Sequence, residues 1–183
     1  MFIAIAWIGE GREPDGLIPS TVAAVAREYT TRALHLRLPG RPAGTYDPAR
    51  GQHASRTVLA WLAGSVPAGG RLLGVTDVDL FVPVLTFVFG EAQLGGRAAV
   101  VSLARLAGAD PAVVRERLIK ESIHELGHTF GLVHCASLTC VMTRSPGLTA
   151  VDRKGPRLCA DCRMRYHELE ESSRASHHAH PDR

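Results

Sequence analysis

The segment from His124 to His134 carries the most informative pattern in the sequence, two histidines four positions apart with a glutamate beside the first. On a helix His124 and His128 lie on one face, one turn apart, so both imidazoles can bind one tetrahedral zinc ion. Gly131 can turn the chain sharply and bring His134 back as a third ligand. Three neutral histidines leave a fourth position open for water, as in a catalytic zinc site.

Glu125 is the residue that such a site needs for hydrolysis. It is rotated about 100° around the helix axis from His124, so it can reach a zinc-bound water without being a ligand. Zinc lowers the pKa of bound water and polarises a carbonyl, and a carboxylate can take the water's proton and pass it to the leaving amine. The alternative is that the histidines are satisfied by packing or solvent. Gly127 is a poor helix former, which a close approach by neighbouring backbone would explain.

The four cysteines follow directly with the spacing C-x4-C-x18-C-x2-C, at Cys135, Cys140, Cys159 and Cys162. Thiolates paired in this way suit a structural zinc ion held by four sulfurs. Two disulfides, a redox pair or unrelated buried thiols are the alternatives. A redox pair requires the C-x2-C at a helix N-terminus in a βαβ unit, and here we expect an irregular stretch before it. Because we see no export signal, we expect reduced thiols and a cytoplasmic location.

These motifs together resemble one family of zinc peptidases. HExxHxxGxxH is similar to the motif of the metzincins, and the following C-x4-C-x-M and C-x2-C resemble the archaemetzincin family within them. TDVDLF (76–81), FVFGEA (87–92) and VVSLARL (100–106) also resemble stretches upstream of the motif in that family. The resemblance therefore reaches from about residue 70 to residue 165.

The resemblance implies a zinc metallopeptidase with two zinc ions. The catalytic zinc would lie on the three histidines with Glu125 as general base, and the structural zinc on the four cysteines. Met142 matches the family's methionine under the metal site, the Met-turn. Arg144 stands where some metzincins carry a tyrosine that approaches the metal, so we expect no further ligand there. An extended peptide substrate is expected beside an edge strand within residues 85–92.

The remaining chain predicts an α/β domain that positions these residues. Asp110 and Pro111 are a good start for the helix carrying the motif. We expect a metzincin-like mixed sheet, mostly parallel with an antiparallel edge strand, packed on helices, with a zinc-stapled C-terminal subregion. The expected strands are 2–8, 34–38, 71–76, 80–90 and 97–103, and the expected helices are 20–33, 53–64, 110–130 and 161–171.

The length of 183 residues favours a single domain over 1–172, with its zinc-binding subregion at 132–172 and a flexible tail at 173–183. Three tail histidines could bind metal adventitiously: His177, His178 and His180.

Charge and hydropathy argue against nucleic-acid and membrane partners, so we expect a peptide or protein substrate. The formal net charge of +3 comes without a basic cluster, which argues against a zinc-ribbon nucleic-acid binder. The longest N-terminal apolar run, residues 2–8, is too short to span a membrane. We expect a monomer. The rival hypothesis is a zinc-stabilised peptide-binding or accessory domain with little turnover; Glu125 favours an enzyme, because a pure binding module does not need it.

Overall fold

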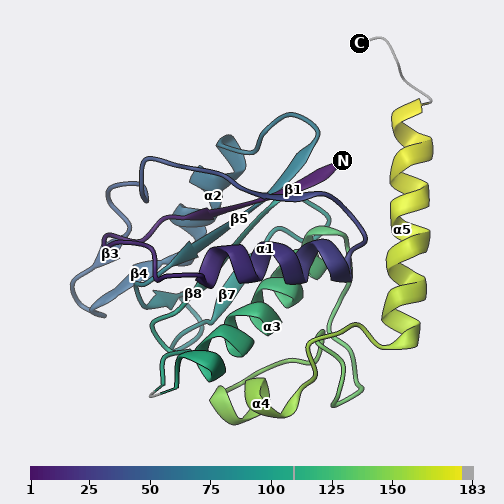
Figure 1. The fold of residues 1–183 in the computed structure, drawn as a ribbon. Helices are drawn as coiled ribbons and strands as arrows, with labels where there is room; N and C mark the ends of the chain where they lie inside the picture. The colour runs from purple at the N-terminus through teal and green to yellow at the C-terminus, as the bar shows by residue number, and fades with distance from the viewer. Residues whose placement is uncertain (109, 179–183) are drawn as a thin grey trace.

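A computed structural model describes residues 1–108 and 110–178 of the chain. Its centre is a five-stranded sheet in the order β2-β1-β5-β8-β7 (Figure 1). The first four strands are parallel and β7 is antiparallel to β8. Their bounds are β1 Phe2–Trp7, β2 Ala33–His35, β5 Gly70–Thr76, β7 Gly90–Ala92 and β8 Ala98–Ser102. The expected mixed α/β fold, mostly parallel with an antiparallel edge strand, is therefore confirmed.

Helices cover both faces of this sheet, because successive side chains of a strand point to opposite faces. Ile3 and Ile5 of β1 pack into the larger core with helices α1 (Leu17–Glu28) and α3 (Pro111–Thr129). Ala4 and Ala6 face the smaller core under helix α2 (Ser55–Gly64). The larger core continues into the C-terminal part of the chain, where α4 (Leu148–Arg153) follows α3 and α5 (Ala160–His178) stands to one side (Figure 1).

Helix α3 forms as the sequence predicts. The Asp110 side chain accepts the Ala112 N–H at 2.8 Å, and Pro111 occupies the first turn, where its missing N–H costs nothing. At the other end Gly131, with φ of 95°, reverses the chain. Its N–H donates to the His128 carbonyl, and the Leu132 N–H donates to the Gly127 carbonyl. This pair of hydrogen bonds is typical of a helix that ends at a glycine.

Other boundaries differ from those expected. Helix α1 begins at Leu17 behind Gly16, three residues before the predicted cap Ser20, because Pro19 is tolerated within a first turn. The β-prone stretch 80–90 is not one strand: β6 covers only Leu80–Phe81, and Pro83 lies in the turns that follow it. A second small sheet, unforeseen, joins β6 to β3 (Tyr46–Asp47) and β4 (Gln52–Ala54).

The C-terminal helix is longer than predicted, since α5 runs to His178 and includes residues expected in a flexible tail. Residues 179–183, with His180, lie outside the described part of the chain. Among the described residues, no helix combines the length and apolar character needed to cross a membrane.

Candidate metal centres and the cleft

The structure brings the three predicted histidines together at the end of α3. His124 and His128 lie one turn apart on the helix, and their Nε2 atoms are 3.1 Å from each other. The turn at Gly131 returns the chain, so the His134 ring lies 5.3 Å and 4.9 Å from the two helical rings, between centroids. Two nitrogens about 2.1 Å from one tetrahedral zinc are about 3.4 Å apart, so these rings fit that ion.

Backbone carbonyls orient the two helical imidazoles. His124 Nδ1 donates to the Val141 carbonyl at 2.8 Å, and His128 Nδ1 donates to the Leu132 carbonyl at 2.7 Å. A carbonyl only accepts, so both rings carry their proton on Nδ1 and present an unprotonated Nε2 to the shared site. Burial lowers the pKa of His124 well below its usual 6.5 and lowers the pKa of His128 and His134 too.

These residues form the floor of a cleft of about 490 Å³. Residues 85–92 and residues 144–146 line the same cleft. Arg144 lines the cleft and is exposed. The expected edge strand is shorter than 85–92, because only Gly90–Ala92 pairs with β8, and residues 85–89 form no strand beyond a single bridge from Val88 to Leu80.

Glu125 lies in the same floor, buried and 6% exposed. Its burial raises its pKa well above 4.5, and the nearby carboxylates Glu121 and Glu91 raise it further, whereas Lys154 lowers it. A methyl group on Gly90 would lie 2.6 Å from Glu125 Cγ, so the edge strand is in direct contact with this side chain.

Met142 is fully buried beneath the histidine-bearing helix. A Cβ on Gly127 would lie 2.5 Å from Met142 Sδ and 3.2 Å from the hydroxyl of Tyr29. The close approach expected at Gly127 therefore exists, but it is made by side chains and not by backbone. The Met142 carbonyl accepts the Cys135 N–H at 3.0 Å, which links this residue to the cysteine cluster.

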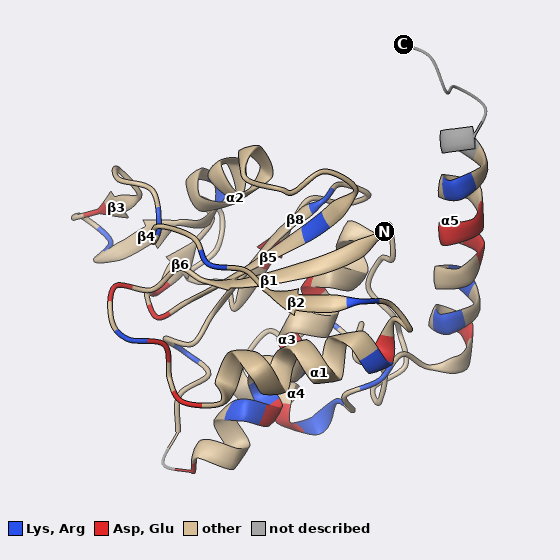
Figure 2. Cartoon of the chain, turned by 45° about the horizontal axis from the view of Figure 1, so that its top comes forward, with Lys and Arg blue, Asp and Glu red and all other residues tan. Residues whose placement is uncertain are grey.

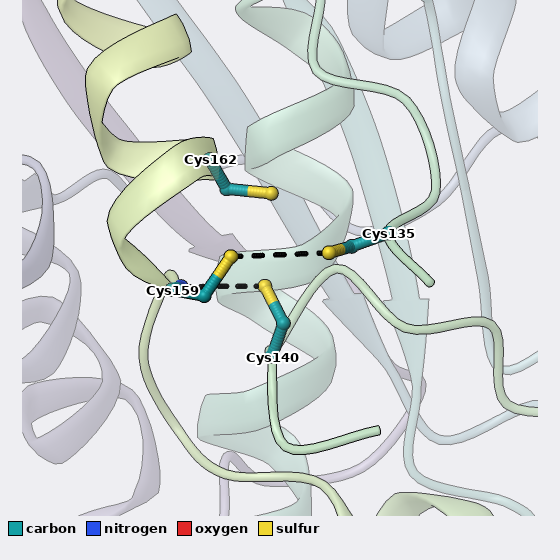
Figure 3. Close-up of side chains that lie close together, drawn as sticks. All are labelled: Cys135, Cys140, Cys159 and Cys162. Atoms are coloured by element: carbon teal, nitrogen blue, oxygen red, sulfur yellow. Dashed lines mark hydrogen bonds between the residues drawn. The ribbon is translucent and has the colours of Figure 1, made fainter. Parts of the chain in front are cut away.

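The four cysteines converge beside the histidines, with all four sulfurs within 4.8 Å of one another (Figure 3). The Cys135 and Cys159 sulfurs are 3.8 Å apart. Two sulfurs about 2.3 Å from one zinc at a tetrahedral angle are about 3.8 Å apart, whereas a disulfide needs about 2.05 Å. All four thiols are free. The geometry therefore fits one zinc ion and does not fit two disulfides.

The C-x2-C pair opens α5, which begins at Ala160, one residue before the start predicted for this helix. Cys159 directly precedes α5 and Cys162 lies in its first turn. Hydrogen bonding from the Cys162 backbone lowers the pKa of Cys159, and burial raises the pKa of Cys140 and Cys162. The other two sulfurs complete a fourfold donor set, which a dithiol redox pair does not require.

Two buried contacts near the site, made by Tyr29 and Lys154, were not predicted from the sequence. Tyr29, the residue after α1, donates from its hydroxyl to the Ile123 carbonyl at 2.5 Å and contacts Phe130 and Tyr166, joining the end of α1 to α3 and α5. Lys154 is buried against Glu121 beneath the cleft. No local spacing signals either contact, because each partner is distant in the sequence.

The family model of peptidase family M54 matches residues 66–168 of this chain. The chain belongs to peptidase family M54. Its class, a zinc metallopeptidase of the archaemetzincin type, is thereby confirmed. Archaemetzincin from Methanopyrus kandleri is similar to this M54 peptidase, with 50% identity over 121 residues, which are 66% of this chain and 69% of the relative.

Solved structures agree with this assignment. The crystal structure of Methanopyrus kandleri archaemetzincin matches this M54 peptidase with a TM-score of 0.86 and 38% identity, over 93% of this chain and 96% of that one. A zinc-dependent peptidase from Methanocorpusculum labreanum matches with a TM-score of 0.82 and 29% identity, over 90% and 99% of the two chains.

Proposed function

We propose that His124, His128 and His134 hold the catalytic zinc ion of this peptidase and that Glu125 is its general base. The observation that carries the proposal is the convergence of the three imidazoles on the floor of an open cleft, with Glu125 in the same floor. Zinc bound there would polarise a peptide carbonyl and acidify a water. His124 and His128 would present Nε2 because their Nδ1 protons are held by carbonyls.

Glu125 is suited to accept and deliver a proton. Burial raises the pKa of its carboxyl group, which favours the uptake of a proton. The Gly90 contact fixes the side chain next to the edge strand. We propose that an extended peptide pairs with that strand, β7, so that its carbonyl lies near the histidines and Glu125.

The four cysteines are proposed to hold a second, structural zinc ion. Because Cys135 follows His134 directly and Cys159 and Cys162 open α5, this ion would tie the third histidine's segment to the C-terminal helix. Four thiolates leave no open coordination position, as in structural sites. Reduced thiols suit a cytoplasmic location, which stays a prediction, as does a monomeric state.

The test compares the unaltered chain with Glu125→Gln on a fluorogenic peptide library, with zinc counted in both proteins. The glutamine keeps the shape of the side chain but cannot take a proton, so hydrolysis should fall by about 10²–10⁴-fold while zinc remains bound. A variant that keeps its zinc and most of its activity would show that Glu125 is not the base. Two bound zinc ions without any cleavage by the unaltered chain would favour a binding role.

A further inference from the structure

Lysine occurs at only two positions in this chain, Lys120 and Lys154, against 19 arginines. Both lysines are buried, with 3% and 1% of their surfaces exposed, and both lie where α4 packs on α3. A buried ammonium is costly unless it is paired. The burial of two lysines beside α3 therefore indicates that they have a role other than surface charge.

Lys154 connects three parts of the candidate zinc site. Its ammonium lies 2.8 Å from Oε1 of Glu121, a residue of α3 that lines the cleft one turn before Glu125. It also donates to the Thr143 carbonyl, at 3.4 Å, in the turn that follows Met142. Its nitrogen is 3.4 Å from His124 Nδ1.

The turn held by Lys154 is the one that orients His124. Val141, two residues before Thr143, supplies the carbonyl that accepts the His124 Nδ1 proton at 2.8 Å. Shifting residues 141–143 relative to α3 would move this acceptor and rotate the imidazole. The Glu121–Lys154–Thr143 connection opposes that shift by joining α3 to the turn across a fully buried ion pair.

We propose that Lys154 is a positioning residue for the catalytic zinc ion, acting through Glu121, Thr143 and the Val141–His124 hydrogen bond. This inference rests on the proposed assignment of His124 as a ligand. Groups that orient a metal-binding histidine typically change metal affinity by 10–100-fold. A compact ammonium suits the site, because a guanidinium with five donors would leave several of them buried and unpaired.

Lys120 is the matched comparison. Its ammonium pairs with the exposed Glu116 at 2.7 Å and donates to the Val151 and Asp152 carbonyls at 3.3 and 3.2 Å, at the end of α4. It shares the burial and the α3–α4 contact of Lys154, and its partners are not residues of the zinc site. Its removal should therefore cost stability without changing zinc affinity.

The experiment uses paired variants, because Lys154→Met alone would leave Glu121 buried and uncompensated. Glu121→Gln/Lys154→Met removes both charges and keeps both shapes, and Glu121→Gln/Lys154→Gln is measured in parallel as a second neutral pair. Glu116→Gln/Lys120→Met is the control. Zinc affinity is measured by native mass spectrometry in chelator-buffered zinc, and protection of thiols from alkylation reports occupancy of the cysteine site.

Both Lys154 pairs should fold, keep zinc on the cysteines and bind the histidine-site zinc at least about tenfold more weakly, whereas the Lys120 pair should match the unaltered chain. Equal histidine-site affinity in the unaltered chain and either folded Lys154 pair would overturn the inference and leave the proposed function intact. Equal weakening in the Lys120 pair would overturn it as well. An unaltered chain that binds no zinc on its histidines would overturn both proposals, and this arm separates that failure from the others.

Discussion

At the scale of single residues, two glycines decide how closely the rest of the molecule approaches the histidine-bearing helix. Gly127 leaves room for Met142, and Gly90 leaves room for Glu125. The sequence flags Gly127 because glycine is a poor helix former, but it gives no such signal for Gly90, which lies in a short edge strand. The candidate ligands were predictable from their spacing, whereas the side-chain contacts made at Gly127 and Gly90 were not.

Gly90→Ala should damage the site while leaving the fold in place. The new Cβ would lie 2.6 Å from both Glu125 Cγ and the Val100 carbonyl, so the strand or the carboxylate must shift. We expect a loss of about 1–3 kcal/mol in the free energy of unfolding and at least about a tenfold loss of hydrolysis. Gly64→Ala, at an exposed position with open space around it, is the control and should keep full activity. Unchanged hydrolysis in Gly90→Ala would show that this contact does not matter.

The candidate ligands also predict how the metal-free protein responds to acid. Each histidine has a pKa lowered from 6.5, so below about pH 6.5 the folded chain binds fewer protons than the unfolded chain. The free energy of unfolding should then fall as pH drops from about 6.5 toward the folded pKa values. Glu121 and Glu125 contribute with the opposite sign, because burial raises the pKa of each, and a stabilising effect of this kind is lost as pH rises.

The measurement therefore uses Glu125→Gln in the presence of a chelator, with urea unfolding at about pH 7.5 and about pH 5.5. The variant should be less stable at the lower pH. A variant that also replaces His124 and His128 with asparagine should show a smaller difference. If the free energy of unfolding changes equally between the two pH values in both proteins, the pKa values of His124 and His128 are not lowered.

At the scale of elements, α3 was the most predictable part of the chain. Its cap, its proline and its terminal glycine are local signals, and they lie where the structure places the helix ends. The six-residue α4 and strands β3 and β4 of the small sheet were not predicted, because elements this short carry too little hydrophobic periodicity. Helix α5 extends beyond its expected end, and charged residues of both signs lie along it (Figure 2) and form pairs such as Arg165–Glu168.

Tyr29 tests how firmly α1 is joined to α3. Tyr29→Phe removes the hydroxyl that donates to the Ile123 carbonyl but keeps the ring against Phe130. We expect a loss of about 1 kcal/mol in the free energy of unfolding, measured in urea. Tyr46→Phe, at a residue 57% exposed, should change stability by less than about 0.5 kcal/mol. If the two variants lose the same amount, the buried hydroxyl is not a significant link.

At the scale of the whole molecule, the two proposed zinc ions connect the sheet domain to its C-terminal part. The cysteines join the segment after α3 to the start of α5, and Tyr166, one turn beyond Cys162 on the same face of that helix, donates to the Tyr29 carbonyl at 3.0 Å. The two sets of candidate ligands were predictable because the residues of each set are spaced in the sequence as zinc ligands typically are. Their side-by-side placement was suggested only by the adjacency of His134 and Cys135.

Zinc should therefore contribute strongly to global stability. Above saturation, each tenfold rise in free zinc adds about 1.4 kcal/mol per site to the free energy of unfolding, so two sites give about 2.8 kcal/mol. Cys140→Ser should reduce this slope to about 1.4 kcal/mol, as should replacing His124 and His128 with asparagine. Unfolding in chelator-buffered zinc measures the slope. A slope that is unaffected by either change would contradict the assignment of the altered ligands.

The most direct test of the two-site account is the number of zinc ions per folded chain, counted by native mass spectrometry. His177, His178 and His180 are replaced with asparagine beforehand, so that the C-terminal histidines add no ions. We expect two zinc ions per chain, and one when either His124 with His128 or Cys140 with Cys162 is replaced. One ion or none in the chain with both donor sets intact would contradict it.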